Sequence, residues 1–472
     1  MEKKNTWETY SSKQLKELEK INAQYRDFLD NGKTERECID TIVNTIEKSG
    51  YRELESLIKE GAALKTGDKV YSVWMNKSIA MFQIGRKPMT EGMNILGAHI
   101  DSPRLDVKQN PLYEDGGFAY LDTHYYGGVK KYQWVTIPLA IHGVIVKKDG
   151  TCVEINIGES EDDPVFFVSD LLIHLAQEQL EKKAAKVIEG EALDIIVGNK
   201  PLLIDKKDKK KDEKEAGKEA VKAGVLDILK ETYDIHEEDF VSAELEIVPA
   251  GKAREAGFDR SMTLAYGQDD RGCAYTSMQA MLDSDVTDRT MCCILVDKEE
   301  IGSVGATGMQ SHFFENAVAE VMNLAGEYSE LNVRRCLAHS CMLSSDVSSA
   351  FDPTYASSFD KKNVAYLGGG MVINKFTGAR GKSGSNDANA EYLAHLRHIF
   401  DKAEVNFQTA ELGKVDLGGG GTIAYILALY GMNVIDSGVA VLNMHAPWEA
   451  TSKADVYETY RGYKAFVEGA SL

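Results

Sequence analysis

Apolar residues follow a helical spacing near the start of the chain and form short continuous runs further along it. Between residues 12 and 63 they return every three or four positions with charges between them, a spacing that predicts helices. At 93–100 the run MNILGAHI is short and apolar, which predicts a buried strand. After residue 256 such runs alternate with longer amphipathic segments. This alternation predicts an α/β fold, with a mostly parallel central sheet and helices on both faces.

The last two hundred residues contain the clearest examples of both patterns. The segments predicted as strands are TMCCILVD (290–297), CLAHSCMLSSD (336–346), GMVIN (370–374) and GVAVLNMH (438–445). The segments predicted as helices are DDRGCAYTSMQAMLDS (269–284), HFFENAVAEVMNLAGE (312–327), ANAEYLAHLRHIF (388–400) and ADVYETYRGYKAFVEGA (454–470). Both ends of the chain therefore contribute to the same α/β pattern.

The pattern changes in the middle of the chain. Short alternating runs between glycines, such as YQWVTIPLAIHGVIVKK (132–148), predict a β-rich unit. We therefore expect an α/β domain made of 1–105 and 256–472, interrupted by an inserted β-rich domain at 106–255. The Lys- and Glu-rich stretch 206–224 within the insertion is predicted to be a solvated loop or an exposed helix, with a lysine-driven binding site as the alternative.

Composition and charge exclude several classes of partner. The chain has 472 residues, a formal net charge of −20 and a pI near 5.1. Such an acidic surface argues against nucleic acids and anionic membranes, because both bind through clustered Lys and Arg. The sequence has no apolar stretch of 18 residues for a membrane span, and no apolar core behind its charged N-terminus for a secretory signal. Its seven cysteines include no CxxC spacing, so we expect reduced thiols and a cytoplasmic protein.

Acidic and imidazole side chains gather where the predicted strands should end. They form five clusters along the chain: His99 with Asp101, Asp269 with Asp270, Glu299 with Glu300, Asp346, and His445. In open α/β sheets, ligands bind outside the carboxyl ends of the strands, so residues far apart in sequence can meet there. An adjacent pair of glutamates usually lies on a solvated surface. Here, however, the pair directly follows an apolar run, and a buried strand end is a costly place for an unpaired carboxylate.

Two histidines with several carboxylates and no cysteine suit a borderline-hard divalent ion such as Zn, Mn or Co. Two such ions would need one bridging carboxylate and further ligands on each. The five clusters supply enough ligands for this arrangement. Asp269 could be the bridge, with Glu300 and His445 on one ion and His99 and Asp346 on the other. Glu299 could then serve as a general base toward the metal-bound water. Asp101 could accept the second ring N–H of His99 and fix its tautomer.

These motifs, in this order, resemble the M18 family of metallo-aminopeptidases, the aspartyl aminopeptidase family. The resembling segments are GAHIDSPR, DDR, DKEEIGS, SSDVSSAFDP and MHAPWEATSKADVYET, and the match covers nearly the whole chain. The resemblance implies a catalytic α/β domain, a β-rich dimerisation domain, and dimers that assemble into a dodecamer. It also implies the same five ligands to two divalent ions, zinc foremost, with Glu299 as the base and Asp101 as the residue that orients His99. Asp270 departs from the family, since other members have Asn there.

The sequence leaves alternatives open for the roles of several further positions. His174, in LLIHLAQEQ, matches a family histidine that reaches into a neighbouring subunit's active site, with a satisfied core histidine or a metal ligand as alternatives. In the loop after GMVIN, Lys375 could pair with an acidic substrate or with the oxyanion, or lie exposed. Because this loop differs from that of members selective for acidic residues, the substrate preference stays open. The glycine-rich start of 417–431 could cradle an anion or simply allow close packing.

The function expected from these observations is that of a dinuclear metal-dependent aminopeptidase, which removes the N-terminal residue of peptides. A metal-bound hydroxide would attack the first peptide bond, with Glu299 as the base. A related two-metal deacylase or carboxypeptidase would use almost the same ligands and is the enzyme alternative. The alternative from another class is a non-catalytic assembly protein, against which the retained base argues. We expect peptide substrates and a homo-oligomer.

Overall fold

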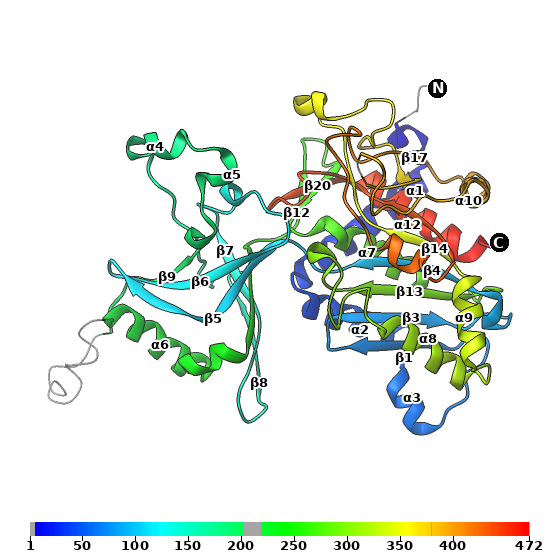
Figure 1. The fold of residues 1–472 in the computed structure, drawn as a ribbon, viewed down its shortest axis with the longest axis horizontal. Helices are drawn as coiled ribbons and strands as arrows, with labels where there is room; N and C mark the ends of the chain where they lie inside the picture. Colours follow the sequence, from blue (N-terminus) through cyan, green and yellow to red (C-terminus); the bar gives the residue numbers. More distant parts are fainter. Residues whose placement is uncertain (1–4, 203–218, 379, 472) are drawn as a thin grey trace. The chain divides into compact units, whose positions relative to one another are not determined.

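The computed structural model describes residues 5–202, 219–378 and 380–471 (Figure 1). These residues pack into two compact units, and the chain passes from the first to the second and back. The first unit consists of Met1–Ser102, Ala253–Met444 and Trp448–Leu472, and the second of Pro103–Lys252 with His445–Pro447. None of the helices in the described ranges is long and apolar enough to cross a membrane.

A nine-stranded mixed sheet forms the centre of the first unit (Figure 1). Its strands, in spatial order, are β1 (Arg52–Glu53), β2 (Lys69–Trp74), β3 (Ser78–Gln83), β13 (Thr290–Val296), β4 (Met93–His99), β14 (Cys341–Ser345), β18 (Asn433–Gly438), β16 (Met371–Asn374) and β17 (Phe407–Thr409). Five of the neighbouring pairs are parallel, including the central run from β13 to β18. The other three pairs are antiparallel.

Helices cover both faces of this sheet because its central strands are apolar on both sides. In β13 every residue is buried, and Cys293 enters one apolar core whereas its neighbour Cys292 enters the other. The first core is covered by α1 (Ser12–Asn31), α2 (Glu35–Glu47), α7 (Gln268–Leu282), α10 (Ala390–Lys402) and α12 (Lys453–Gly469). The second is covered by α3 (Leu54–Glu60), α8 (Phe313–Leu324), α9 (Glu330–Ala338) and α11 (Ala424–Ala428). The predicted α/β fold is confirmed.

A smaller, five-stranded sheet in the same unit joins two distant parts of the chain. Its strands are β11 (Arg254–Ala256), β12 (Met262–Ala265), β20 (Glu449–Ser452), β19 (Ala440–Leu442) and β15 (Ser348–Ser349). The last residue of β12 pairs with the first residue of β20, and β12 leads directly into α7. This sheet therefore places the closing motif of the chain beside the start of α7.

The second unit is built on a six-stranded antiparallel sheet. Its strands are β8 (Cys152–Ile157), β7 (Leu139–Val146), β10 (Ala243–Pro249), β5 (Arg104–Asp115), β6 (Phe118–Tyr126) and β9 (Ile195–Gly198). The unit also contains α4 (Gln177–Leu180), α5 (Ala184–Val187) and α6 (Ala220–Tyr233). The inserted segment is thus β-rich, as the alternating pattern predicts. Most of the Lys- and Glu-rich stretch 206–224 lies outside the described residues, and α6 contains its last five.

Two predicted strands differ in the structure. The prediction of a strand from Cys336 is wrong, because α9 continues to Ala338 and β14 begins only at Cys341. Val333, Cys336 and Leu337 are buried at helical spacing, and this periodicity extends into the segment that looked like a continuous strand. The predicted strand 438–445 is also interrupted, since β18 ends at Gly438 and β19 covers only Ala440–Leu442.

Candidate metal centre

Three neighbouring parallel strands carry acidic and imidazole groups to one edge of the central sheet. β4 ends at His99, which lies opposite Val296, the last residue of β13. Three residues further on, the 3-10 helix η7 (Glu299–Ile301) begins with both glutamates. On the other side of β4, β14 ends one residue before Asp346. The carboxyl ends of these strands therefore bring the predicted side chains to one place.

The side chains form two overlapping groups of potential metal ligands. The first contains His99, Asp269 and Glu300, and the second contains His99, Glu299 and Asp346. Within each group the ligand atoms all lie within 4.8 Å of one another. His99 Nε2 is 3.4 Å from Asp269 Oδ1 and 3.9 Å from Glu299 Oε2. His99 and Asp269 are deeply buried, at 1% and 3% exposure.

Asp101 connects the two strands that deliver these groups. Its Oδ1 lies 3.3 Å from His99 Nδ1, and the same ring nitrogen is 3.0 Å from the Asp101 carbonyl oxygen. Its two carboxylate oxygens also accept the backbone N–H groups of Glu299 and Glu300, each at 3.1 Å. The first N–H groups of a helix have no partner within it, and a carboxylate satisfies them well. Asp101 therefore contacts the imidazole and also fixes the turn that carries both glutamates.

Negative charge accumulates at this edge of the sheet. Burial raises the pKa of Asp346 well above its ordinary value, and the carboxylates of Asp269 and Asp270 raise it further. Burial also raises the pKa of Asp270 to about 8. Burial alone would lower the pKa of His99, but its contacts with Asp101 and Asp269 outweigh this and raise it well above the usual value. A divalent cation would relieve the repulsion among these carboxylates.

The donor atoms are of the types that divalent metals prefer. Both groups combine an imidazole nitrogen with carboxylate oxygens, and neither contains a cysteine. Such a donor set suits Zn, and also Mn or Co. The residues present therefore fit a bound metal, and His99 belongs to both groups.

His445 lies among the residues of the second unit. Its Nδ1 is 3.0 Å from the carbonyl oxygen of Gly128, and its backbone has a positive φ of 65°. Neither group of ligand atoms described above includes it. Its role as a metal ligand remains a prediction.

His174 and Lys375 both have solvent-exposed side chains. His174 lies in the 3-10 helix η4 (Ile173–Leu175) of the second unit, so the alternative of a satisfied core histidine is wrong. Lys375 follows β16 in the first unit, and its carbonyl oxygen accepts the N–H of Ala388 at 2.9 Å. Both side chains are available to a ligand or to another subunit.

Asp436 is a buried acid that belongs to none of the sequence motifs. It lies in β18, and its Oδ1 accepts the hydroxyl of Thr422 at 2.5 Å. Burial raises its pKa to about 7. Thr422 directly follows the four glycines at 418–421, so this bond attaches the end of the glycine-rich run to the central sheet. Its signal in the sequence is a single acid in the strand segment NVIDSG, directly after the apolar pair Val434 and Ile435.

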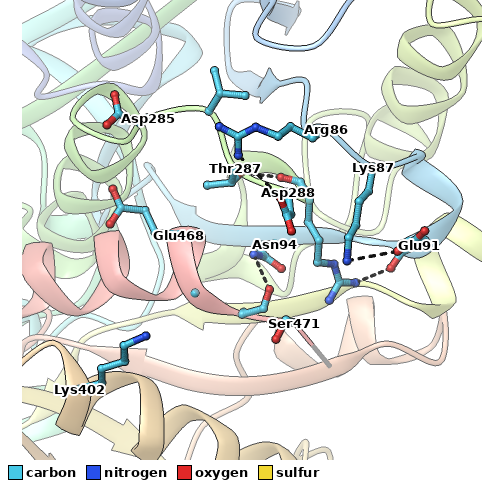
Figure 2. Close-up of a pocket in the computed structure, with 14 residues that line it drawn as sticks. Arg86, Lys87, Glu91, Asn94, Asp285, Thr287, Asp288, Lys402, Glu468 and Ser471 are labelled. Carbon is cyan, nitrogen blue, oxygen red and sulfur yellow. Dashed lines mark hydrogen bonds and ion pairs between the residues drawn. The ribbon is translucent and has the colours of Figure 1, made fainter.

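A hollow of about 630 Å³ lies at the opposite ends of the same strands. It is lined by Asn94, the second residue of β4, and by the residues that precede β13 (Figure 2). Arg86 pairs with Asp288 at 3.7 Å, and Lys87 with Glu91 at 3.6 Å. Because these opposite charges pair with each other, they do not resemble the crowded carboxylates at the other edge.

An α/β sheet with histidine and carboxylates gathered at the carboxyl ends of its parallel strands is typical of metal-dependent hydrolases. The family model for aminopeptidase I zinc metalloproteases (M18) matches residues 28–467. The chain is 63% identical to the probable M18 family aminopeptidase 1 of Clostridium acetobutylicum over 466 residues, which cover 99% of this chain and 98% of that one. The chain therefore belongs to the M18 family of aminopeptidases, as the sequence motifs indicate.

Solved structures agree with this assignment. The crystal structure of an M18 family aminopeptidase from Thermotoga maritima has a TM-score of 0.93 and 44% identity, with 100% of both chains covered. That of aminopeptidase I from Clostridium acetobutylicum has a TM-score of 0.90 and 60% identity, with 99% of each chain covered. The protein is accordingly a hydrolase of the metalloexopeptidase class.

Proposed function

We propose that this aminopeptidase uses two divalent ions, with zinc foremost, held by His99, Asp269, Glu300, Asp346 and His445. The observation that carries the proposal is the pair of overlapping ligand groups that share His99 at the carboxyl ends of β4, β13 and β14. Asp269 would bridge the ions, because a carboxylate has two oxygens to share and its Oδ1 lies 3.4 Å from His99 Nε2. A single ion would leave several of these closely spaced carboxylates without a counter-charge.

The chemistry follows from the positions of Glu299 and Asp101. When bound, the ions would lower the pKa of a coordinated water and polarise the scissile carbonyl group. Glu299 would accept a proton from the attacking water and deliver it to the leaving amine. Its backbone N–H is held by Asp101, so the base and the imidazole of His99 keep a fixed relation. A general base is effective only when its geometry is maintained.

The substrates would be peptides with a free N-terminus. The carboxylates that crowd this edge favour a positively charged α-amine, which restricts cleavage to the first residue. The exposed Lys375 lies in the loop that would face the substrate side chain, where its ammonium group would pair with an acidic first residue.

Removal of metal is expected to lower aminopeptidase activity by at least about 10³-fold, because the water would lose its acidity and the carbonyl its polarisation. Prolonged dialysis against a chelator, followed by addition of Zn, Mn or Co, would measure this effect. Metal analysis of the active protein should give two equivalents per chain. Full activity with one equivalent or with none would contradict the two-metal proposal.

A comparison of substrates would distinguish an aminopeptidase from a deacylase. Aminoacyl and N-acyl chromogenic substrates that carry the same side chain differ in whether the α-amine is free and charged or blocked by an acyl group. An aminopeptidase should hydrolyse the first group and not the second, whereas a deacylase should do the reverse. A panel of acidic, neutral and basic first residues would then define the preference.

We also propose that the protein forms a homo-oligomer through the segment around η4. Apolar side chains are exposed there, with Ile173 at 66% and Leu175 at 68%. Contiguous apolar surface of this kind is typical of an interface. His174 stands between these two residues, so a second copy that covers them would also meet the imidazole.

Replacement of His174 by Ala is expected to lower turnover by about 10²-fold, the scale of one lost hydrogen-bond donor in an active site. The thermal stability of the isolated protomer should not change, because the side chain is exposed in the single chain. The decisive measurement mixes this variant with Glu299→Gln before assembly. If His174 serves a neighbouring copy, hybrid oligomers should recover activity that neither variant has alone. Absence of recovery in hybrids verified by mass would reject this role.

A further inference from the structure

The peptide backbone of Asp269 is held on both sides by buried side chains. Its N–H donates to Glu449 Oε2 at 3.0 Å, and its carbonyl oxygen accepts the hydroxyl of Ser102 at 2.7 Å. Glu449 is 1% exposed and Ser102 is fully buried. A hydrogen bond from a backbone N–H to a buried carboxylate is charge-assisted and stronger than a neutral one. The backbone of Asp269 is therefore fixed while its carboxylate faces His99.

The preceding residue is tied to the same strand. The side chain of Gln268 donates to the carbonyl oxygen of Glu449 at 2.6 Å and accepts the hydroxyl of Thr451 at 2.7 Å. It also accepts the hydroxyl of Tyr25, from α1, at 3.1 Å. Strand β20 thus contacts two consecutive residues at the start of α7. Any movement of β20 would be transmitted directly to Asp269.

We propose that Glu449 is a positioning residue that sets the direction of the Asp269 carboxylate and thereby the affinity for metal. Ser102 would restrain the same residue through its hydrogen bond to the Asp269 carbonyl oxygen. This inference rests on the proposed function, in which Asp269 is a metal ligand. Residues that hold a ligand typically change metal affinity by 10- to 100-fold when they are replaced. Glu449 is four residues beyond His445, so the closing motif would support the metal centre in two separate ways.

The test measures zinc affinity by competition with a chromogenic chelator on the full-length protein. Glu449→Ala removes the acceptor and is expected to weaken zinc binding by about 10- to 100-fold. Glu449→Gln keeps an acceptor oxygen at the same distance along the side chain, so its affinity should stay within about threefold of the wild type. Rescue by the amide would show that the hydrogen bond to Asp269 determines the affinity.

Asp455 provides the matched control. It is a fully buried carboxylate that accepts the backbone N–H groups of Gly368 and Gly370, each at 2.8 Å, and neither glycine is a proposed ligand. Asp455→Ala should destabilise the metal-free protein about as much as Glu449→Ala, yet leave zinc affinity unchanged. Equal loss of affinity in both variants would show that the effect is general destabilisation, and would overturn the proposal.

The remaining outcomes separate this inference from the proposed function. If the wild type binds zinc no better than Asp269→Asn, the proposed ligand set fails. If the wild type binds tightly, Asp269→Asn does not, and Glu449→Ala binds like the wild type, only the positioning role fails. Should Glu449→Ala not fold, Ser102→Ala removes the other bond to the same peptide group. Unchanged zinc affinity in that variant would reject the proposal.

Discussion

The Glu299→Gln variant is expected to retain its metal and to lose about 10³-fold or more of kcat, with little change in KM. General base catalysis contributes about 10²- to 10⁴-fold, and an amide cannot accept the proton. The substitution is nearly isosteric, and the backbone N–H of residue 299 can still donate to Asp101. Steady-state kinetics on an aminoacyl substrate, with metal analysis of the same preparation, would measure both effects.

Glu300→Gln is the matched control for this prediction. Its backbone N–H is held by the same carboxylate, so the two glutamates have equivalent support from Asp101. Because Glu300 is a proposed metal ligand, however, its replacement should lower the metal content as well as the activity. Loss of metal in Glu299→Gln, or retention of more than about a tenth of the wild-type kcat, would remove Glu299 from the role of base.

The ends of the parallel strands could be predicted from the sequence because two simple signals coincide there. An apolar run such as MNILGAHI marks the buried strand, and the first polar residues after it mark the carboxyl end. Parallel pairing then brings His99 next to the end of β13, with Val296 opposite. The gathering of His99, Glu299 and Asp346 follows from this topology and does not depend on details of packing.

The residues that hold the ligands could not be predicted in this way. The sequence predicts Asp101 beside His99, but its bonds to the N–H groups of Glu299 and Glu300 depend on the local path of the turn. Glu449 contacts Asp269 across a strand pairing between residues far apart in the sequence. Periodicity describes which side chains are buried, and it contains no information about which backbone group a buried carboxylate will meet.

The segment at Cys336 shows another limit of prediction from apolar periodicity. Its apolar residues are compatible with a strand, and the decisive signal is the spacing of Val333, Cys336 and Leu337, which begins before the apolar run. Short apolar runs cannot be assigned to helix or strand from periodicity alone. The error does not affect the predicted position of Asp346, because β14 ends at Ser345, directly before it.

Asp269→Asn is expected to have the largest effect of any single substitution in this centre. A bridging ligand contributes to both ions, so its loss should release both and lower kcat/KM by about 10⁴-fold or more. In the absence of metal the same substitution removes one of the charges that repel Asp346, so the metal-free variant should unfold at a higher temperature than the metal-free wild type. With saturating zinc the order should reverse, since only the wild type gains stability from binding.

Asp270→Asn separates the loss of a ligand from the loss of a charge. Asp270 is a fully buried neighbour that also repels Asp346, but it belongs to neither group of ligand atoms. Above about pH 8, where the Asp270 carboxyl is ionised, its replacement should stabilise the metal-free protein in the same direction. Zinc should still raise the melting temperature, and activity should stay within about tenfold of the wild type. Thermal melts of the three proteins with and without zinc provide the comparison. If zinc stabilises Asp269→Asn as much as the wild type, Asp269 is not the bridge, and the crowding of carboxylates around His99 must serve another purpose.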